Sequence, residues 1–225
     1  MLSLKQGLSL SARKSLGGWT PTDEATLEGW YQNKIGITLN GSNVSQWADQ
    51  STNSRDMVQS DDPEQPAYNS STGALTFDSS NKSNLQTSGQ ISVSGDFTLG
   101  IRMNPTTANG TFVADNTTAN ELFKISSDSQ ITIKIDGGTG VIGLDSGSFG
   151  DDYIVLTRVS NVFTLYKNGS PQSTTQTLSG TIDIDAIGIR EENRNGFSGT
   201  IEEVQIYSSS SDTLTSNINS RLSSL

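Results

Sequence analysis

Hydrophobic and polar residues alternate along most of the chain, a pattern typical of half-buried β-strands. The strongest stretch is 153–169, where two runs rich in Val, Ile, Thr, Tyr and Phe flank a break at Ser160 and Asn161. Such residues favour a pleated surface, and Asn168 with Gly169 supplies the positive φ values of a tight hairpin turn. Because both runs are nearly continuous in apolar and β-branched residues, the pattern predicts a hairpin in the middle of a sheet, covered on both faces.

Further strands are expected where the alternation returns, most clearly over 96–103. Pro63 and Pro66 exclude a central strand from the polar, turn-rich stretch 49–69. The other expected strands are 35–39, 44–47, 74–77, 111–114, 121–125, 130–135, 141–144, 182–189 and 200–207. Many short strands separated by turn residues predict a β-sandwich.

One helix is predicted near the end of the chain. Its apolar stripe, at helical spacing, consists of Leu214, Ile218, Leu222 and Leu225. Asp212 or Thr213 is the expected N-cap. A helix this short is marginal alone in water, so it is expected to pack on the sandwich.

The first 20 residues differ from the rest. Their leucines, which alternate with Ser and lie on one side of an extended chain, are Leu2, Leu4, Leu8 and Leu10. The formal net charge of the chain is −10, yet residues 1–22 contain Lys5, Arg13 and Lys14 and no acid. We therefore expect an extended N-terminal docking arm over 1–20 and a single domain over 21–225. The arm could instead fold back on its own domain.

Composition excludes several classes of function. The chain has no His and no Cys, so a Ser-His triad cannot form. An acidic chain is a poor nucleic-acid binder. No stretch approaches the about 18 apolar residues of a membrane-spanning helix. Lys5, Gln6 and Gly7 interrupt any apolar signal region, so no signal peptide is expected.

Asp183 and Asp185 are the best candidates for acid chemistry. Alternate residues of a strand lie about 6.7 Å apart on one face, near the spacing of the carboxylates in glycoside hydrolases. The next position on that face is Ile187 rather than a third acid. The pattern therefore favours a solvent-facing pair, and no hydrolase activity is predicted.

The sequence contains candidates for two other kinds of site. Calcium, which prefers oxygen ligands, is the one plausible metal, and the loop acids that could bind it are Asp115, Asp136, Asp151 and Asp152. They lack the spacing of a known calcium loop, so we expect solvated acids and no cofactor. Trp30 and Trp47 lie in apolar contexts typical of a core, whereas Trp19 follows two glycines and is expected to anchor the arm.

Several motifs resemble a known family. The sequence FTLYKNG at 163–169 resembles the strand and turn of laminin-G-like, concanavalin-A-like jelly rolls, and FSGTIEEVQIY at 197–207 resembles their closing strand. The segments 27–31, 44–49 and 77–81 are similar to the opening parts of bacterial and phage members. The resemblance covers about 27–225. It implies an all-β, two-sheet antiparallel jelly-roll sandwich that binds sugars or proteins, in a family that often holds calcium at a sheet rim.

The opening residues 1–11 resemble the start of virion structural proteins of marine tailed phages, including cyanophages. Together the two resemblances imply a non-enzymatic virion protein, made in the host cytoplasm and exposed on the particle surface as a capsid decoration, fibre or tail component. Its expected partners are other virion proteins, copies of itself and surface glycans, without nucleic acid or membrane. The alternative is a carbohydrate-binding lectin-type module or host-attachment adhesin. A glycosidase is the third alternative.

Overall fold

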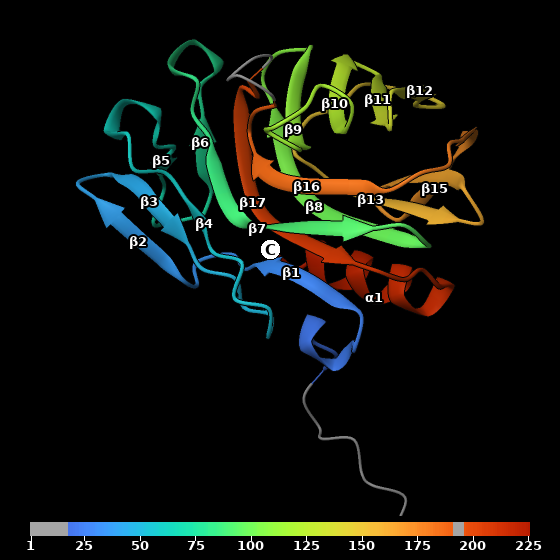
Figure 1. Cartoon of the computed structure of the whole chain (residues 1–225), viewed down its shortest axis with the longest axis horizontal. Helices are drawn as coiled ribbons and strands as arrows, with labels where there is room; N and C mark the ends of the chain where they lie inside the picture. The colour runs from blue at the N-terminus through green and yellow to red at the C-terminus, as the bar shows by residue number, and fades with distance from the viewer. Residues whose placement is uncertain (1–17, 191–195) are drawn as a thin grey trace, which may run out of the picture.

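The computed structural model describes residues 18–190 and 196–225 (Figure 1). The arm leucines Leu2, Leu4, Leu8 and Leu10 lie outside the described residues. Three short 3-10 helices are η1 (Pro21–Asp23), η2 (Asp62–Glu64) and η3 (Ser79–Asn81), and the α-helix is α1 (Asp212–Leu222). The strands are β1 (Leu27–Tyr31), β2 (Ile37–Asn40), β3 (Asn43–Trp47), β4 (Met57–Val58), β5 (Ala67–Tyr68), β6 (Leu75–Phe77), β7 (Leu85–Val93), β8 (Phe97–Pro105), β9 (Gly110–Ala114), β10 (Leu122–Ser127), β11 (Gln130–Ile135), β12 (Gly138–Gly143), β13 (Asp152–Val159), β14 (Val162–Lys167), β15 (Ser170–Thr177), β16 (Ile182–Ile187) and β17 (Gly199–Tyr207).

The strands form two layers joined at one end. In the back layer, β1 and β6 pair along one side of β17, and β8, β13, β14 and β15 follow in order on its other side. The front layer has the order β2, β3, β4, β7, β16, β9, β10, β11 and β12 (Figure 1). β5 pairs with both β3 and β6 and so links the layers. All ladders between these strands are antiparallel, which confirms the predicted jelly-roll sandwich.

A continuous apolar core fills the space between the layers. Leu99 and Ile101 of β8 lie opposite Leu156 and Ile154 of β13, and all four side chains are fully buried. Each such side chain contributes roughly 1.5–3 kcal/mol when it leaves water. Trp47 is also fully buried in this core, as its sequence context predicted.

The strand β13 is covered on both faces as predicted, but β14 is not, since Val162 is 37% exposed and Thr164 and Tyr166 are half-buried. β13 pairs with β8 on one side and with β14 on the other. The turn at Ser160 and Asn161 joins β13 to β14, with φ of 49° and 69°, and the turn at Asn168 and Gly169 joins β14 to β15, with φ of 49° and 80°. These are the turn conformations that match the twist of a tight hairpin.

The helix α1 packs on the outer face of the back layer. Leu214, Ile218 and Leu222 are buried there. They contact Leu27, Trp30, Val155 and Tyr207, so the predicted apolar stripe is confirmed over three of its four residues. Leu225 follows the helix and is 37% exposed. The N-cap is Ser211 rather than Asp212 or Thr213, because the Ser211 Oγ accepts a hydrogen bond from the Leu214 amide at 3.1 Å.

Several strand predictions were wrong in detail. The strands β1, β7 and β15 were not predicted, and β12 begins at Gly138 rather than at 141. β15 reads SPQSTTQT and is exposed at most positions, because it lies at the edge of the back layer. It therefore lacks the apolar alternation that predicts a strand. Residues 49–69 contribute only the two-residue strands β4 and β5.

Candidate functional site

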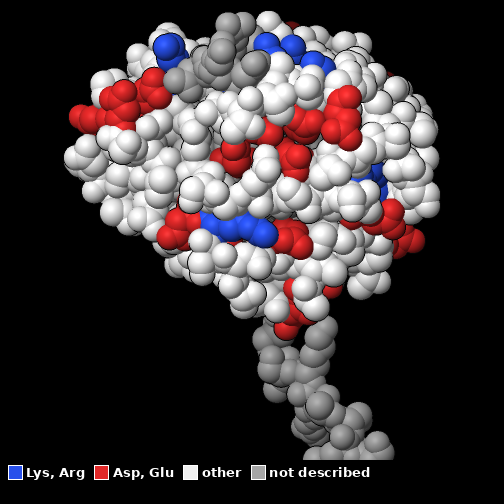
Figure 2. All heavy atoms as spheres, in the orientation of Figure 1, with Lys and Arg blue, Asp and Glu red and all other residues white. Residues whose placement is uncertain are grey.

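Acidic side chains gather on the outer face of the front layer (Figure 2). Asp183 and Asp185 point outward from β16, while Ile184 between them is buried in the core. Asp115 and Glu121 lie beside them, at the ends of β9 and β10. We call the outer face around these four residues the acidic face. Asp183 and Asp185 face outward as predicted but are half-buried, and Asp115 and Glu121 are only 3% and 5% exposed.

Burial and mutual repulsion alter the proton affinity of this cluster. Burial raises the pKa of Asp185 to about 6, and the neighbouring charges of Asp115 and Asp183 act in the same direction. A hydrogen bond of 2.6 Å from the Asn116 amide to Asp185 Oδ1 opposes the shift. Burial also raises the pKa of Glu121. Ionisation of Asp185 and Glu121 therefore lowers the stability of the folded state.

The acidic face lacks the geometry of a three-carboxylate glycosidase strand. The pairing of β16 with β7 is irregular between Ile184 and Ala186, which turns Ile187 into the core. Asp183 and Asp185 accept hydrogen bonds from the Ser92 hydroxyl and the Asn116 amide. The two acids are thus used in contacts between strands.

The four calcium candidates contact different partners. Asp115 belongs to the acidic face, and the backbone amide of Asp136 donates to Glu121 Oε1 at 3.0 Å. Asp151 pairs with Arg102 and Asp152 with Lys167, both at 3.0 Å. Within 18–190 and 196–225, no group of three or more acids is arranged to hold a metal ion. The calcium alternative therefore gains no support from these residues.

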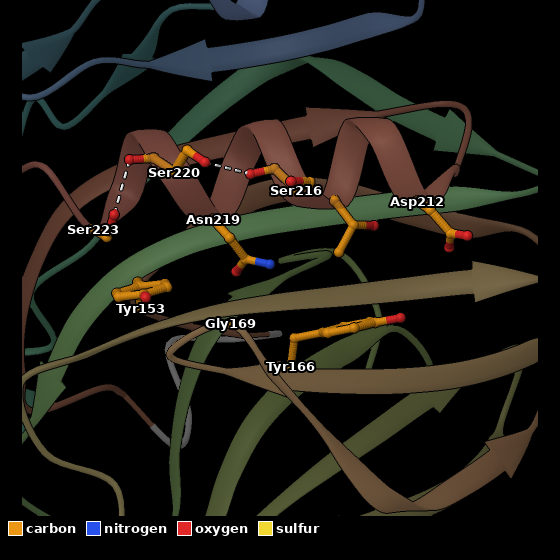
Figure 3. Close-up of a pocket in the computed structure, with 9 residues that line it drawn as sticks. Tyr153, Tyr166, Gly169, Asp212, Ser216, Asn219, Ser220 and Ser223 are labelled. Carbon is orange, nitrogen blue, oxygen red and sulfur yellow. Dashed lines mark hydrogen bonds between the residues drawn. The ribbon is translucent and has the colours of Figure 1, made fainter.

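A groove between α1 and the hairpin of β13 and β14 is the better candidate for a ligand site (Figure 3). Its volume is about 440 Å³, within the roughly 300–1,000 Å³ of small-ligand sites. Tyr153 of β13 and Tyr166 of β14 form the floor, and Gly169 lies at the turn beside them. Both tyrosines are half-buried and pack against the apolar residues under α1.

The opposite wall of the groove is a polar stripe of α1. It consists of Asp212, Thr215, Ser216, Asn219, Ser220 and Ser223, which recur at the three- and four-residue spacing of one helix face. Figure 3 shows the Asn219 carboxamide pointing from the helix toward the tyrosine floor. Asn219 Oδ1 has no hydrogen-bond partner among the described residues. We call this site the helix groove.

A buried polar network fixes the helix above the sheet. Glu203 of β17 is fully buried, and it accepts hydrogen bonds from Arg221 Nη2 at 2.9 Å and Trp30 Nε1 at 3.0 Å. The Arg221 guanidinium lies 4.8 Å from the centre of the Trp30 ring. Breaking such a buried pair leaves an uncompensated charge, so the network holds the groove wall in place.

The helix groove was not predicted from the sequence. The apolar stripe of α1 was predicted and its polar stripe was not, although Asp212, Ser216 and Ser220 recur at helical spacing. Tyr153 and Tyr166 were interpreted only as strand residues. Trp19, which was expected to anchor the arm, donates a hydrogen bond from Nε1 to Glu24 at 2.8 Å and packs beside the α1 cluster.

Comparison with protein families shows one match. Residues 77–214, more than half of the chain, match the model described as the concanavalin A-like lectin/glucanases superfamily. The chain belongs to this superfamily. No curated protein matches this concanavalin A-like chain.

Solved structures share the fold of this concanavalin A-like chain. Domain 4 of AbnA, a GH43 extracellular arabinanase from Geobacillus stearothermophilus in complex with arabinotriose, has a TM-score of 0.59 at 14% identity, over 87% of this chain and 97% of that one. A Trypanosoma rangeli sialidase in complex with 2,3-difluoro-KDN has a TM-score of 0.56 at 15% identity, over 89% of this chain. The chain spans about a third of the sialidase, 33% of its length.

A third similar structure is a mutant of HCR/D, with a TM-score of 0.58 at 11% identity, over 88% of this chain and 52% of that one. At these identities the likeness concerns the fold. Across the part of this concanavalin A-like chain that the structure describes, no helix is long and apolar enough to span a membrane.

Proposed function

We propose that the chain is a carbohydrate-binding module of the lectin type, and that the helix groove is its binding site. The observation that carries the proposal is the combination of a tyrosine floor with a wall of amide and hydroxyl groups. The C–H face of a sugar ring packs on an aromatic ring, while its hydroxyls need polar partners at the edge. Tyrosine supplies both an apolar body and a polar tip.

The family and the fold neighbours support this proposal at the level of class. The family description includes lectins. The AbnA domain, which is similar over nearly its whole length, is described in complex with arabinotriose. Because a fold does not dictate a function, the assignment to this chain rests on the chemistry of the helix groove.

We propose further that the module does not hydrolyse its ligand. The helix groove contains one carboxylate, Asp212, and glycoside hydrolysis ordinarily uses two. On the acidic face, Asp183 and Asp185 are held by hydrogen bonds to neighbouring strands, and β16 carries no third outward acid. Release of reducing sugar from polysaccharides, lost in Asp185→Asn, would overturn this part of the proposal.

A glycan array probed with the whole chain and with two groove variants tests the binding proposal. Tyr166→Ala removes half of the floor, and Ser216→Trp fills the groove from an exposed helix position. Each is expected to weaken binding at least about tenfold, the loss of one well-packed contact. Because Tyr166→Ala also removes packing, Ser216→Trp is the decisive variant.

Thr213→Trp is the matched control, since Thr213 is exposed on α1 and does not line the groove. It should bind like the unaltered chain, and thermal melts should show that both Trp variants are folded. Absence of glycan binding by the unaltered chain would contradict the proposed function. Binding that survives in Ser216→Trp would place the site elsewhere.

A second proposal concerns assembly. The N-terminal 22 residues carry three positive charges and no acid, whereas the domain is strongly acidic. This asymmetry, with the alternating Leu2, Leu4, Leu8 and Leu10, supports a docking arm. We propose a virion as its partner, on the resemblance of residues 1–11 to virion proteins. Mass spectrometry of purified particles tests it, and particles that lack the protein would contradict it.

A further inference from the structure

We infer that the helix groove selects an uncharged oligosaccharide chain that lies along α1, in preference to acidic sugars and to monosaccharides. This inference rests on the proposed function and adds the class of ligand. It follows from the charge of the groove, from its hydrogen-bonding groups and from its direction along the helix.

The charge of the groove excludes an anionic ligand. Its lining contains Asp212 and neither Lys nor Arg. The basic side chains around it are held by other acids. Lys167 pairs with Asp152 at 3.0 Å and Arg221 pairs with Glu203. Arg102, which lies beside Tyr153, pairs with Asp151 at 3.0 Å and Glu202 at 3.5 Å. A carboxylate or sulfate moved from water into this groove would lose hydration without gaining a cation, which is unfavourable. Recognition of such anions normally uses Arg or Lys.

The hydrogen-bonding groups suit neutral hydroxyls, which both donate and accept. Ser220 Oγ donates to the Ser216 carbonyl at 2.9 Å, and Ser223 Oγ donates to the Ser220 carbonyl at 2.9 Å. Both hydroxyl oxygens therefore retain lone pairs that can accept from a ligand. The Asn219 amide nitrogen and the tyrosine hydroxyls add donors. An anion, which only accepts, would leave the serine lone pairs without partners.

The groove extends along the helix axis. Its polar stripe begins at Asp212 and ends at Ser223, so it follows the whole of α1. Eleven residues at about 1.5 Å each give a length of roughly 16 Å. The two tyrosines lie at different places along this stripe, Tyr153 toward its Ser223 end and Tyr166 toward its Asp212 end (Figure 3). A single sugar ring would contact only part of it, whereas a short chain of rings would contact both tyrosines.

Isothermal titration of the full chain with matched ligands tests the inference. The probes are cellotriose, maltotriose and β-1,4-galactotriose, each beside the same trisaccharide with its primary hydroxyls oxidised to carboxylates, and glucose and galactose. We expect at least one neutral trisaccharide to bind about tenfold or more tightly than its oxidised counterpart and than its monosaccharide. Asp212→Asn, which removes the groove's carboxylate, should reduce the preference against the oxidised ligand, measured as the ratio of neutral to oxidised affinity.

The outcomes separate the two levels of the argument. An oxidised trisaccharide that binds as tightly as its neutral form, with binding lost in Ser216→Trp and kept in Thr213→Trp, overturns the inference and leaves the proposed function standing. Equal affinity for a monosaccharide and its trisaccharide overturns the extended binding mode. No binding by any neutral probe overturns the inference, and the glycan array then decides the proposed function independently.

Discussion

The two outer faces of this sandwich differ in their residues and in what covers them. The outer face of the back layer is apolar at Trp30, Val155 and Tyr207, and α1 covers it. The outer face of the front layer carries Asp183 and Asp185, which point outward from β16 and are half-buried. Both faces arise from the same alternation of strand residues. The residues at the outward positions therefore decide which face becomes part of the fold and which faces water.

The difference is visible in the sequences of the central strands. β13 reads DYIVLTRV, with apolar residues on both faces, whereas β16 reads IDIDAI, with acids at its first two outward positions. A nearly continuous apolar run is typical of a strand covered on both sides. The helix groove exists because α1 covers the back layer incompletely and leaves its polar stripe beside Tyr153 and Tyr166.

The largest expected effect is the loss of the ion pair that fixes α1. Arg221→Met leaves the fully buried Glu203 without its cation, which should lower the free energy of unfolding by about 3–5 kcal/mol. The comparison is Arg55→Met beside β7, where Arg55 and Glu28 are 23% and 24% exposed and the pair contributes at most about 1 kcal/mol. Urea melts measure both, and equal losses would show that covering by α1 does not strengthen the Arg221–Glu203 pair.

A smaller effect is expected from crowding the contact between α1 and β8. A methyl group added at Gly100 would collide with Ile218 Cγ2. Gly100→Ala should therefore destabilise the chain by about 1–3 kcal/mol. In an Ile218→Ala background the same change should have almost no effect, because the colliding group is gone. Additive losses in this double-mutant cycle would show that α1 does not press on Gly100.

A substitution on the acidic face should raise the free energy of unfolding, whereas those under α1 should lower it. The folded pKa of Asp185 is raised from 3.8 to about 6, so its protonated form stabilises the fold below pH 4. This stability is lost as pH rises through 6. Asp185→Asn should therefore be more stable than the unaltered chain by about 1–2 kcal/mol at pH 7.5, discounting for its partial exposure, and nearly equal to it at pH 4. A constant difference between pH 4 and pH 7.5 in thermal melts would contradict this assignment.

The smallest effect is expected at the N-terminus. Deleting residues 2–18 should change the free energy of unfolding by less than about 0.5 kcal/mol, because we expect this segment to be a docking arm. Denaturant melts at low and high salt measure this. A clear destabilisation that salt removes would mean that Lys5, Arg13 and Lys14 neutralise the acidic face within the same molecule.

The sequence predicted the features that depend on local pattern. Three such features were confirmed. They are the two strands within 153–167, the turn at Asn168 and Gly169, and the buried helix stripe of Leu214, Ile218 and Leu222. The family resemblance was confirmed as well. The virion role and the docking arm stay predictions.

What the sequence could not show depends on contacts between distant residues. Glu203 is adjacent to Glu202 in sequence, and only the fold reveals that Arg221 and Trp30 surround it. Tyr153 and Tyr166 become a groove floor only once α1 lies across their hairpin. The strand β15 has almost no apolar signal, because its place at an exposed edge requires none.

The position of α1 in the chain has a consequence for how the protein is made. A ribosome releases β8 and β13 long before the segment that covers them, since Gly100 and Val155 precede Ile218 by many residues. Until α1 emerges, the nascent chain exposes Trp30 and Val155 to solvent. Such exposed surface is a target for chaperones and for aggregation during synthesis. The outer face of the back layer is therefore covered only after the strands beneath α1 have been made, and the helix groove forms only then.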